Sequence, residues 1–495
     1  MNPTEQEIAL PMPPATYIRR ATKIVATLGP ASSDVATLAQ MIATGVNVVR
    51  LNFSHGSAQE HIARAQAVRE ASRQAGREVA IMVDLQGPKI RVGKFAQGKV
   101  NLEVGASFVL DAARTEPGDA EGVGLDYKEL PRDVRAGDVL LLNDGLIVLR
   151  VQRVLGDAVH TQVLVGGELS NNKGINKQGG GLTAPALTAK DMEDIKTAMQ
   201  LGADYVAVSF PKNATDMEMA RQLCTVAAAG TGHRPGLIAK MERAEAVPHL
   251  EDILRVSDGI MVARGDLAVE VGNAAVPALQ KKMIRMARQM DKVVITATQM
   301  MESMITSPLP TRAEVSDVAN AVLDGTDAVM LSAETAVGKY PLETVREMAY
   351  ICAAAEAAED VGNEAGWGQP RSLTRIDQSI ALGALFTAHH LGAKAIVAMT
   401  DSGSTALWMS RHRIHIPIYA LTPKVSTQRK MALYRNVSPL LMDTSAERDQ
   451  ALAQAENHLR ERGIVQPGDV YAITCGEPMG QPGGTNMLQI CRVAG

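Results

Sequence analysis

The sequence has few of the features that mark secreted, membrane-spanning or nucleic-acid-binding proteins. Only four cysteines occur in 495 residues. They lie far apart and form no CxxC pair, which argues against both a disulfide framework and a structural zinc site. No run of about 18 apolar residues is present, and the N-terminal segment lacks the apolar core of a signal peptide. We therefore expect a protein of the reducing cytoplasm that has no contact with a membrane.

An extended basic surface is also missing. The formal net charge is −4, and acidic and basic residues are interspersed along the chain. This pattern argues against nucleic acid as a partner and favours small molecules. With 46% hydrophobic residues, the chain is long enough to build two or three domains, each with a substantial core.

Short runs rich in β-branched residues recur through the first two thirds of the chain, and helical stretches separate most of them. The eight runs are KIVATL (23–28), VVRLNF (48–53), AIMVDL (80–85), YVAVSF (205–210), LIAKME (237–242), GIMVAR (259–264), VVITAT (293–298) and AVMLSA (328–333). Eight strand–helix units are the number found in a closed β/α (TIM) barrel.

The connection between the third and fourth runs is about 120 residues long, which is too much for a loop. It contains strand-like segments joined by turn signals such as Asn143-Asp144-Gly145, and this predicts an inserted all-β domain. Gly179-Gly180-Gly181, near its exit, is either a hinge or a solvated loop. Further strand–helix alternation after the Gly/Pro-marked segment 362–372 predicts a C-terminal open α/β domain. The predicted domains are 1–87 and 186–361 for the two parts of the barrel, 88–185 for the inserted β-barrel lid domain and 362–495 for the C-terminal regulatory domain.

Polar residues gather where the barrel strands end. In a β/α barrel the carboxyl ends of the strands form the active site. The polar residues at these ends are Arg50 and Asn52, Asp84, Lys240 and Glu242, Arg264 and Asp266, Thr298 and Gln299, and Ser332 and Glu334.

Lys240 and Glu242 are two residues apart on one strand, so their side chains share a face and can contact one substrate. Glu242 and Asp266, from neighbouring strands, offer the hard oxygens that Mg²⁺ or Mn²⁺ prefers. A purely structural ion pair is the alternative for Lys240 with Glu242. Free N–H groups near Gly265 are suited to a carboxylate or phosphate, and the Thr298 hydroxyl is suited to proton delivery or to a simple turn hydrogen bond. The combination predicts a metal-dependent enzyme for a small phosphorylated carboxylate.

These residues lie in stretches that together resemble pyruvate kinase, in the same order and around the same inserted domain. The matching stretches are TKIVATLGP (22–30), NVVRLNFSHG (47–56), DLQGPKIR (84–91), AKMERAEAV (239–247), MVARGDLAVE (261–270), ITATQMMESM (295–304) and the segment 310–341. The resemblance covers nearly the whole chain and extends weakly into the C-terminal domain. It implies a bacterial-type enzyme of glycolysis that forms a homotetramer.

The resemblance implies Mg²⁺-dependent phosphoryl transfer from phosphoenolpyruvate to ADP. Arg50 and Lys240 would grip the phosphoryl group, and Glu242 and Asp266 would hold Mg²⁺ or Mn²⁺. The N–H groups near Gly265 and Asp266 would bind the substrate carboxylate, and Thr298 would belong to the proton-delivery apparatus. The positions that match nucleotide contacts are Asn52, His55, Arg91 and, in the inserted domain, Lys173.

One departure from the family concerns the monovalent cation. The family's potassium site uses oxygens at the positions of Asn52, Ser54, Asp84 and the main chain of Leu85. Leu85 and Lys89 stand where many members have threonine and glutamate. The ammonium group of Lys89 can take the electrostatic role of the cation. We therefore predict an enzyme that does not need K⁺.

A second phosphate site is predicted in the C-terminal domain, where a hydroxyl-rich loop follows a strand. The loop resembles the family's effector loop, and its residues are Thr400, Ser402, Gly403, Ser404 and Thr405. An ordinary Ser/Gly turn is the alternative. Because Asp401 replaces a residue that is basic in some members, we expect a sugar monophosphate or AMP as activator. The basic cluster 411–415 is interpreted as a solvated or subunit-contacting surface.

Two other functions compete with the kinase. A phosphoenolpyruvate- or oxaloacetate-type lyase also uses two carboxylates and a cation, but it does not account for the inserted domain. A non-catalytic binding module would have lost at least one strand-end charge, and none is missing. Pyruvate formation from phosphoenolpyruvate and ADP separates the three hypotheses.

Overall fold

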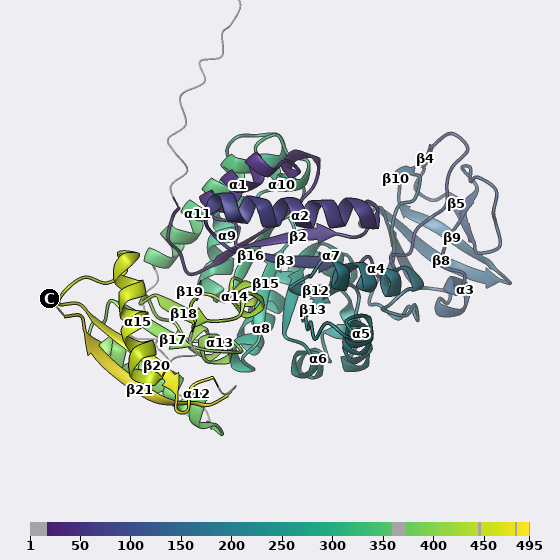
Figure 1. Cartoon of the computed structure of the whole chain (residues 1–495). Coiled ribbons are helices and arrows are strands. Elements are labelled where there is room, and N and C mark those ends of the chain that lie inside the picture. Colours follow the sequence, from purple (N-terminus) through teal and green to yellow (C-terminus); the bar gives the residue numbers. More distant parts are fainter. Residues whose placement is uncertain (1–16, 359–372, 444–446, 481–482, 495) are drawn as a thin grey trace, which may run out of the picture.

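The computed structural model describes residues 17–358, 373–443, 447–480 and 483–494, and it contains three folded regions (Figure 1). A barrel occupies the middle of the molecule. The inserted β region extends from one side of it, and the C-terminal region packs at the opposite side. The predicted boundary segment 362–372 lies outside the described residues.

Eight parallel strands close the barrel, in the order β1-β16-β15-β14-β13-β12-β3-β2. The strands are β1 (Lys23–Thr27), β2 (Val48–Asn52), β3 (Ala80–Asp84), β12 (Tyr205–Val208), β13 (Gly236–Met241), β14 (Gly259–Ala263), β15 (Val293–Ala297) and β16 (Ala328–Leu331). Each coincides with one predicted run, so the barrel prediction is confirmed.

Helices cover the outside of the barrel. They are α1 (Val35–Thr44), α2 (Ala58–Ala75), α4 (Ala189–Gln200), α5 (Ala214–Ala227), α6 (Leu250–Val256), α7 (Arg264–Val271), α8 (Val276–Gln289), α9 (Arg312–Asp324), α10 (Ala333–Ala336) and α11 (Pro341–Ala357). Local sequence sets several of their starts. Ser57 and Glu60 form a capping box on α2, and Thr311 and Glu314 form one on α9. Each box supplies partners for N–H groups that the first helical turn leaves free.

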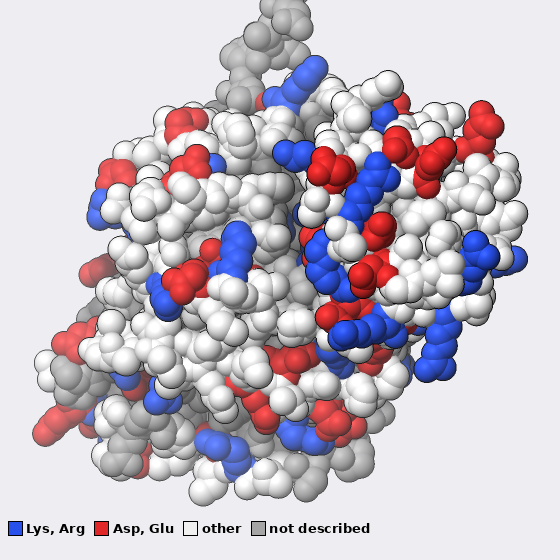
Figure 2. All heavy atoms as spheres, turned by 90° about the vertical axis from the view of Figure 1, so that its right-hand side faces the viewer, with Lys and Arg blue, Asp and Glu red and all other residues white. Residues whose placement is uncertain are grey.

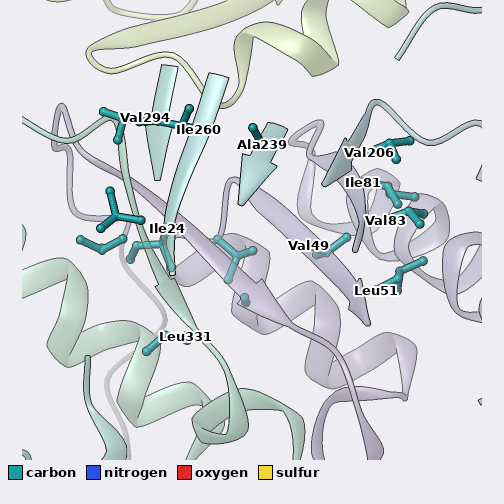
Figure 3. Close-up of a cluster of buried hydrophobic side chains, with 14 of the residues drawn as sticks. Ile24, Val49, Leu51, Ile81, Val83, Val206, Ala239, Ile260, Val294 and Leu331 are labelled. Atoms are coloured by element: carbon teal, nitrogen blue, oxygen red, sulfur yellow. The ribbon is translucent and has the colours of Figure 1, made fainter. Parts of the chain in front are cut away.

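Strand residues alternate between two hydrophobic clusters, and this alternation positions the site. Ile24, Val49 and Leu51 belong to the outer cluster, where strand side chains meet the helices (Figure 3). Val48 and Ile238 belong to the cluster inside the barrel. Because side chains alternate along a strand, Arg50 shares the face of Val48, and Lys240 shares that of Ile238. Both therefore project toward the central mouth.

The inserted region is an all-β domain with its own core. Its elements are β4 (Lys99–Leu102), β5 (Ser107–Asp111), β6 (Gly122–Gly124), α3 (Leu130–Asp133), β7 (Val139–Leu142), β8 (Ile147–Leu155), β9 (Ala158–Val165), β10 (Gly167–Ser170) and β11 (Ile175–Lys177). They form a six-stranded sheet and a two-stranded sheet around buried side chains that include Phe108 and Leu149. Asn143 and Asp144 adopt positive φ angles of 51° and 56° in the predicted turn, a conformation that Asn and Asp tolerate.

The C-terminal region is an open α/β sheet, as predicted. Its elements are α12 (Ile376–His390), β17 (Ala395–Met399), α13 (Ser404–Ser410), β18 (Ile418–Thr422), α14 (Val425–Met431), β19 (Val437–Leu441), α15 (Arg448–Glu461), β20 (Val470–Gly476) and β21 (Thr485–Arg492). The strand order is β19-β18-β17-β20-β21, and the edge strand β21 runs antiparallel to β20.

The interpretation of the basic cluster 411–415 as a surface is wrong for Arg411. This side chain is buried, and its guanidinium forms a bidentate ion pair with the Asp327 carboxylate. In this pair Nη1 lies 2.9 Å from Oδ2. Asp327 directly precedes β16 and also accepts hydrogen bonds from the backbone N–H groups of Val294 and Arg435. The sequence pattern could not reveal this burial, because Arg411 becomes buried only when the C-terminal region, which carries it, packs against the barrel.

Candidate active site

A network of charged side chains lies at the mouth of the barrel, with Asp84 at its centre. Arg50 Nε lies 2.6 Å from Asp84 Oδ2, and Lys240 Nζ lies 3.1 Å from Asp84 Oδ1. Lys240 Nζ also lies 2.9 Å from Glu242 Oε1 and donates to Ser209 Oγ at 2.7 Å. Strands β2, β3, β12 and β13 thus each place at least one member in the network.

Burial makes the charges in this network depend on one another. Burial by itself would lower the pKa of Lys240, but the carboxylates of Asp84 and Glu242 outweigh it and hold that pKa above its usual value. Burial would likewise raise the pKa of Asp84, but Arg50 and Lys240 lower it. Lys240 is therefore a firmly charged ammonium group, and Asp84 is a carboxylate held between two cations.

Glu242 and Asp266 form an acidic pair beside this network. Burial and then the negative charges of Asp266 and Asp84 raise the pKa of Glu242 to about 7, against the opposing effect of Lys240. Glu242 Oε2 accepts a hydrogen bond from the Phe210 N–H at 2.8 Å. Asp266 Oδ1 lies 3.6 Å from Lys89 Nζ. A divalent cation would relieve the repulsion between these two carboxylates.

The donor set fits a hard cation that keeps water or substrate oxygens as its other ligands. Among the described residues, no group of three or more His, Cys, Asp and Glu side chains is placed to hold a metal. Two carboxylates without nitrogen or sulfur ligands are suited to Mg²⁺ or Mn²⁺ and ill-suited to Zn²⁺.

Gly265 and Thr298 face each other closely at the ends of β14 and β15. A Cβ atom on Gly265 would lie 2.8 Å from Thr298 Cγ2, so only glycine fits there. Thr298 has a φ of 77°, which is unusual for a β-branched residue. Arg264 stabilises this backbone, since its Nη2 donates to the Thr298 carbonyl at 2.6 Å while its Nη1 pairs with Asp317 at 2.6 Å.

The four nucleotide-contact candidates fall into two groups. Asn52 ends β2, and the exposed His55 follows it in the same loop. Arg91 and Lys173 lie together where the inserted domain joins the barrel, because Arg91 bridges to Gly174 and the Val92 N–H donates to the Lys173 carbonyl at 2.9 Å. The two groups come from different regions of the chain, the first from the barrel and the second from the inserted domain.

Protein donors already bind several oxygens of the candidate monovalent-cation site. Asn52 Oδ1 accepts from the Ser54 N–H at 3.1 Å, and the Leu85 carbonyl accepts from Ser209 Oγ at 2.7 Å. Both Asp84 oxygens are paired with cations, as described above. Lys89 itself reaches toward Asp266.

The candidate effector loop encloses a pocket between β17 and the segment before β21. The Thr400 hydroxyl accepts from the Gly403 N–H at 2.9 Å, and the hydroxyls of Ser402 and Ser404 lie 3.0 Å apart. Thr405 Oγ1 lies 2.9 Å from Thr485 Oγ1 across the pocket. Asp401 pairs with Lys424 at 2.5 Å. Among the described residues that line this pocket there is no Lys or Arg.

The predicted site does not include Ser209, and the sequence does not reveal the supporting role of Glu334. Ser209 was not recognised, although it is the polar residue that follows β12, and its hydroxyl joins Lys240 to the Leu85 carbonyl. Glu334 was assigned to the strand-end set, but it is buried and supports loops instead. Its carboxylate accepts from the N–H groups of Ser332 at 2.6 Å and Met301 at 3.2 Å.

The face that carries the inserted domain shows charges of both signs side by side. Figure 2 displays lysine and arginine side chains among aspartate and glutamate side chains, without a broad area of one sign. None of the helices in the described part of the chain has the length and apolar character needed to span a bilayer.

The closed barrel and the ionic network at its strand ends define a β/α-barrel enzyme that handles a small anion. Comparison with known families makes this specific. The family model "Pyruvate kinase, barrel domain" matches residues 19–345, and "Pyruvate kinase, alpha/beta domain" matches residues 378–491. The chain belongs to the pyruvate kinase family and is a kinase that transfers phosphate.

Individual relatives agree with this assignment over nearly the whole chain. The chain is 52% identical to pyruvate kinase II of Salmonella typhimurium, with 96% of this chain and 99% of the relative covered. It is 49% identical to a pyruvate kinase of Haemophilus influenzae, with 96% and 98% covered. A crystal structure of a pyruvate kinase from Cryptosporidium parvum matches with a TM-score of 0.90 at 34% identity, covering 96% of both chains.

Proposed function

We propose that this kinase uses Mg²⁺ to transfer the phosphoryl group of phosphoenolpyruvate to ADP, with Lys240 and Arg50 as its phosphoryl-binding cations. The observation that carries the proposal is the position of Lys240. Its ammonium group sits between Asp84 and Glu242 and is held in the charged state by both. A fixed, partly buried cation at a strand end is suited to stabilising negative charge that moves during phosphoryl transfer.

The remaining barrel residues would orient the substrate. Free N–H groups at the start of α7, near Gly265 and Asp266, would bind the substrate carboxylate. Thr298 turns its methyl group toward Gly265, and its hydroxyl at the end of β15 would lie near the enolate carbon that must gain a proton. Arg264 acts through Thr298, because it holds the Thr298 backbone without any role in the chemistry itself.

Glu242 and Asp266 would hold the divalent cation. When bound, the cation supplies charge neutralisation to the phosphoryl and enolate oxygens. The two carboxylates lower the electrostatic cost of binding it, because their mutual repulsion is released. Mn²⁺ has similar ligand preferences and would substitute.

The nucleotide would bind between the barrel and the inserted domain. Asn52 and His55 would contact ADP from the barrel side, and Arg91 and Lys173 from the side of the inserted domain. The paired backbone of residues 90–92 and 173–175 supports this arrangement, since it couples the two cations to any movement of the domain. The inserted domain would then act as a lid that closes over ADP.

We infer that catalysis does not require K⁺. The oxygens of Asn52, Asp84 and Leu85 already have protein donors, so a monovalent cation would compete with existing interactions. Lys89 brings an ammonium group close to Asp266 and would supply the positive charge that K⁺ supplies elsewhere in the family.

A phosphorylated effector would activate the enzyme from the pocket at Thr400, Ser402, Gly403, Ser404 and Thr405. Hydroxyls and N–H groups there suit one phosphate group. Asp401 would repel a second one, although its pairing with Lys424 weakens the repulsion. This balance favours a sugar monophosphate or AMP over a bisphosphate.

A cytoplasmic homotetramer is the expected assembly. The edge strand β21 supports association through the C-terminal region, because its outer edge has no partner strand in the described chain. Unpaired edge N–H and C=O groups are ready to pair with another subunit.

A coupled assay tests the central proposal. Wild-type protein should form pyruvate from phosphoenolpyruvate and ADP only when Mg²⁺ or Mn²⁺ is present. Lys240→Met should abolish most of this rate, whereas Lys196→Met, at an exposed lysine of α4, serves as the control. Pyruvate formation that is absent in the wild type, or unchanged in Lys240→Met, contradicts the proposal.

A further inference from the structure

The inserted domain attaches to the barrel through two chain segments that pair with each other. The Ile175 N–H donates to the Ile90 carbonyl at 2.9 Å, and the Val92 N–H donates to the Lys173 carbonyl at 2.9 Å. Beyond β11 the chain returns to the barrel through residues 178–184, which we name the return segment. Any restraint on the return segment is therefore passed directly to Lys173.

The return segment is bound to the barrel at three consecutive stretches of backbone. Arg243 Nη1 donates to the Leu182 carbonyl at 3.2 Å, and a carboxylate oxygen of Glu245 accepts a short hydrogen bond from the Gly181 N–H. The Gly179 N–H donates to the main-chain oxygen of Glu270 at 3.2 Å. Arg243 and Glu245 follow β13 directly, so they stand on the same rigid strand end as Lys240.

Gly180 is required for this close approach. A Cβ atom on Gly180 would lie 2.9 Å from Cδ and 3.0 Å from Cγ of Glu245. The neighbouring Gly179 has almost the same φ, 79° against 81°, but a Cβ atom there would meet nothing within 4 Å. Alanine substitutions at the two glycines therefore distinguish the effect of the contact with Glu245 from the effect of a positive φ.

A cleft joins these contacts to the candidate active site. Its lining includes Lys89 and Asp266 as well as Gly180, Arg243 and Glu245. Two polar atoms near the cleft have spare capacity, since Arg243 Nε and Glu245 Oε2 are buried without a hydrogen-bond partner among the described residues. Arg243 Nη1 and Glu245 Oε2 lie 3.8 Å apart. The pair can thus adjust to a moving segment without breaking an optimal bond.

We propose that Arg243 and Glu245 form a latch that holds the return segment and so fixes the angle at which the inserted domain presents Lys173 and Arg91 to the nucleotide. Both are positioning residues, because neither contacts the reacting groups. A carboxylate that accepts a backbone N–H forms a charge-assisted bond, which is stronger than a neutral one. The inference rests on the proposed function, in which ADP binds under the inserted domain.

Kinetic comparison of glycine variants tests the latch. Gly180→Ala should raise KM for ADP by about tenfold, the effect of losing one hydrogen bond to a charged group, with KM for phosphoenolpyruvate unchanged. Gly179→Ala also places alanine at a positive φ and should have a much smaller effect. Glu245→Ala should raise KM for ADP as much as Gly180→Ala does. When Glu245→Ala is already present, Gly180→Ala should raise KM for ADP no further than Gly179→Ala does. Glu251→Ala, at an exposed carboxylate of α6, is the matched control.

Hydrogen–deuterium exchange supplies a readout that does not depend on catalysis. The amides of residues 179–182 should exchange faster in Glu245→Ala than in wild type. In Glu251→Ala their exchange rate should equal that of wild type. Unaltered exchange in Glu245→Ala overturns the latch, and so does an equal rise in KM for both substrates. If the wild-type protein forms no pyruvate, the proposed function fails, and the exchange experiment still decides whether the latch exists.

Discussion

Lys240 Nζ lies 3.1 Å from Asp84 Oδ1, although strand β12 separates the strands β13 and β3 that carry these residues. The contact crosses the interior of the barrel mouth instead of following the ladder of neighbouring strands. Asp84 therefore positions two cations from different sides, Arg50 from β2 and Lys240 from β13. The geometry of the proposed phosphoryl site depends on this one carboxylate.

Replacement of Asp84 should accordingly disable the enzyme without touching the substrate directly. Asp84→Asn leaves Arg50 and Lys240 as like charges with no shared counterion. We expect kcat to fall by about a hundredfold or more, the scale of losing preorganised charge at an active site. Steady-state rates measure this, and Asp252→Asn, at an exposed carboxylate of α6, is the control. A variant with full kcat would show that Asp84 is dispensable.

The contact between Gly265 and Thr298 predicts that Gly265→Ala lowers activity and that a second substitution, at Thr298, restores it. Gly265→Ala would push Cβ against Thr298 Cγ2, at 2.8 Å. We expect kcat to drop by about tenfold to a hundredfold, because a displacement of about 1 Å is costly in an active site. Thr298→Ser removes the methyl group but keeps the hydroxyl. The double variant should recover much of the activity lost by Gly265→Ala, and failure to recover it argues against this steric account.

Lys89 should determine the response to monovalent cations. Wild-type rates should be the same in K⁺ and in tetramethylammonium, which is too large to occupy a K⁺ site. Lys89→Met removes the ammonium group beside Asp266, so its rate in tetramethylammonium should fall, and K⁺ should restore part of it. A strong K⁺ requirement in the wild type would contradict the prediction.

Glu270 should make the stability of the fold depend on pH. Burial raises its pKa to about 7, and Glu245 adds to the rise, while the Ala244 N–H, Arg243 and Asn176 oppose it. The folded protein thus keeps this proton between pH values of about 4.5 and 7, where the unfolded chain has lost it. Because the folded state binds more protons there, the contribution of Glu270 to stability falls as pH rises through this window.

Glu270→Gln mimics the protonated form and removes this dependence. Relative to wild type, its free energy of unfolding should be higher by about 2–3 kcal/mol at pH 8 and nearly equal at pH 4.5. Thermal unfolding at the two pH values measures the difference. The expected order is reversed if ionised Glu270 is the more stable form in the fold.

Removing one partner of the buried ion pair between Arg411 and Asp327 should destabilise the contact between the barrel and the C-terminal region. Arg411→Met leaves Asp327 buried with less charge compensation, and such a loss typically costs about 3–5 kcal/mol. We expect a clear decrease in thermal stability, measured by calorimetry. Arg413→Met, two residues away in the same cluster, should have a smaller effect.

The barrel follows from the sequence pattern, because eight apolar runs with helical spacers leave little choice of architecture. The pattern also determined which polar residues reach the mouth, since alternation along a strand fixes the face on which Arg50, Lys240 and Glu242 project. Family motifs then determined the class of reaction. All of these features depend on local sequence, where periodicity and motif spacing carry the information.

Which of these residues contact one another is visible only in the folded protein. The sequence could not show that Asp84 joins Arg50 to Lys240, that Ser209 completes the network or that Glu334 supports loops. It misplaced Arg411, whose burial depends on docking between regions about 80 residues apart, and it left Gly180 as one of three equivalent glycines. The reason is physical: these contacts are made between segments distant in the chain, and their distances exist only once the domains have packed.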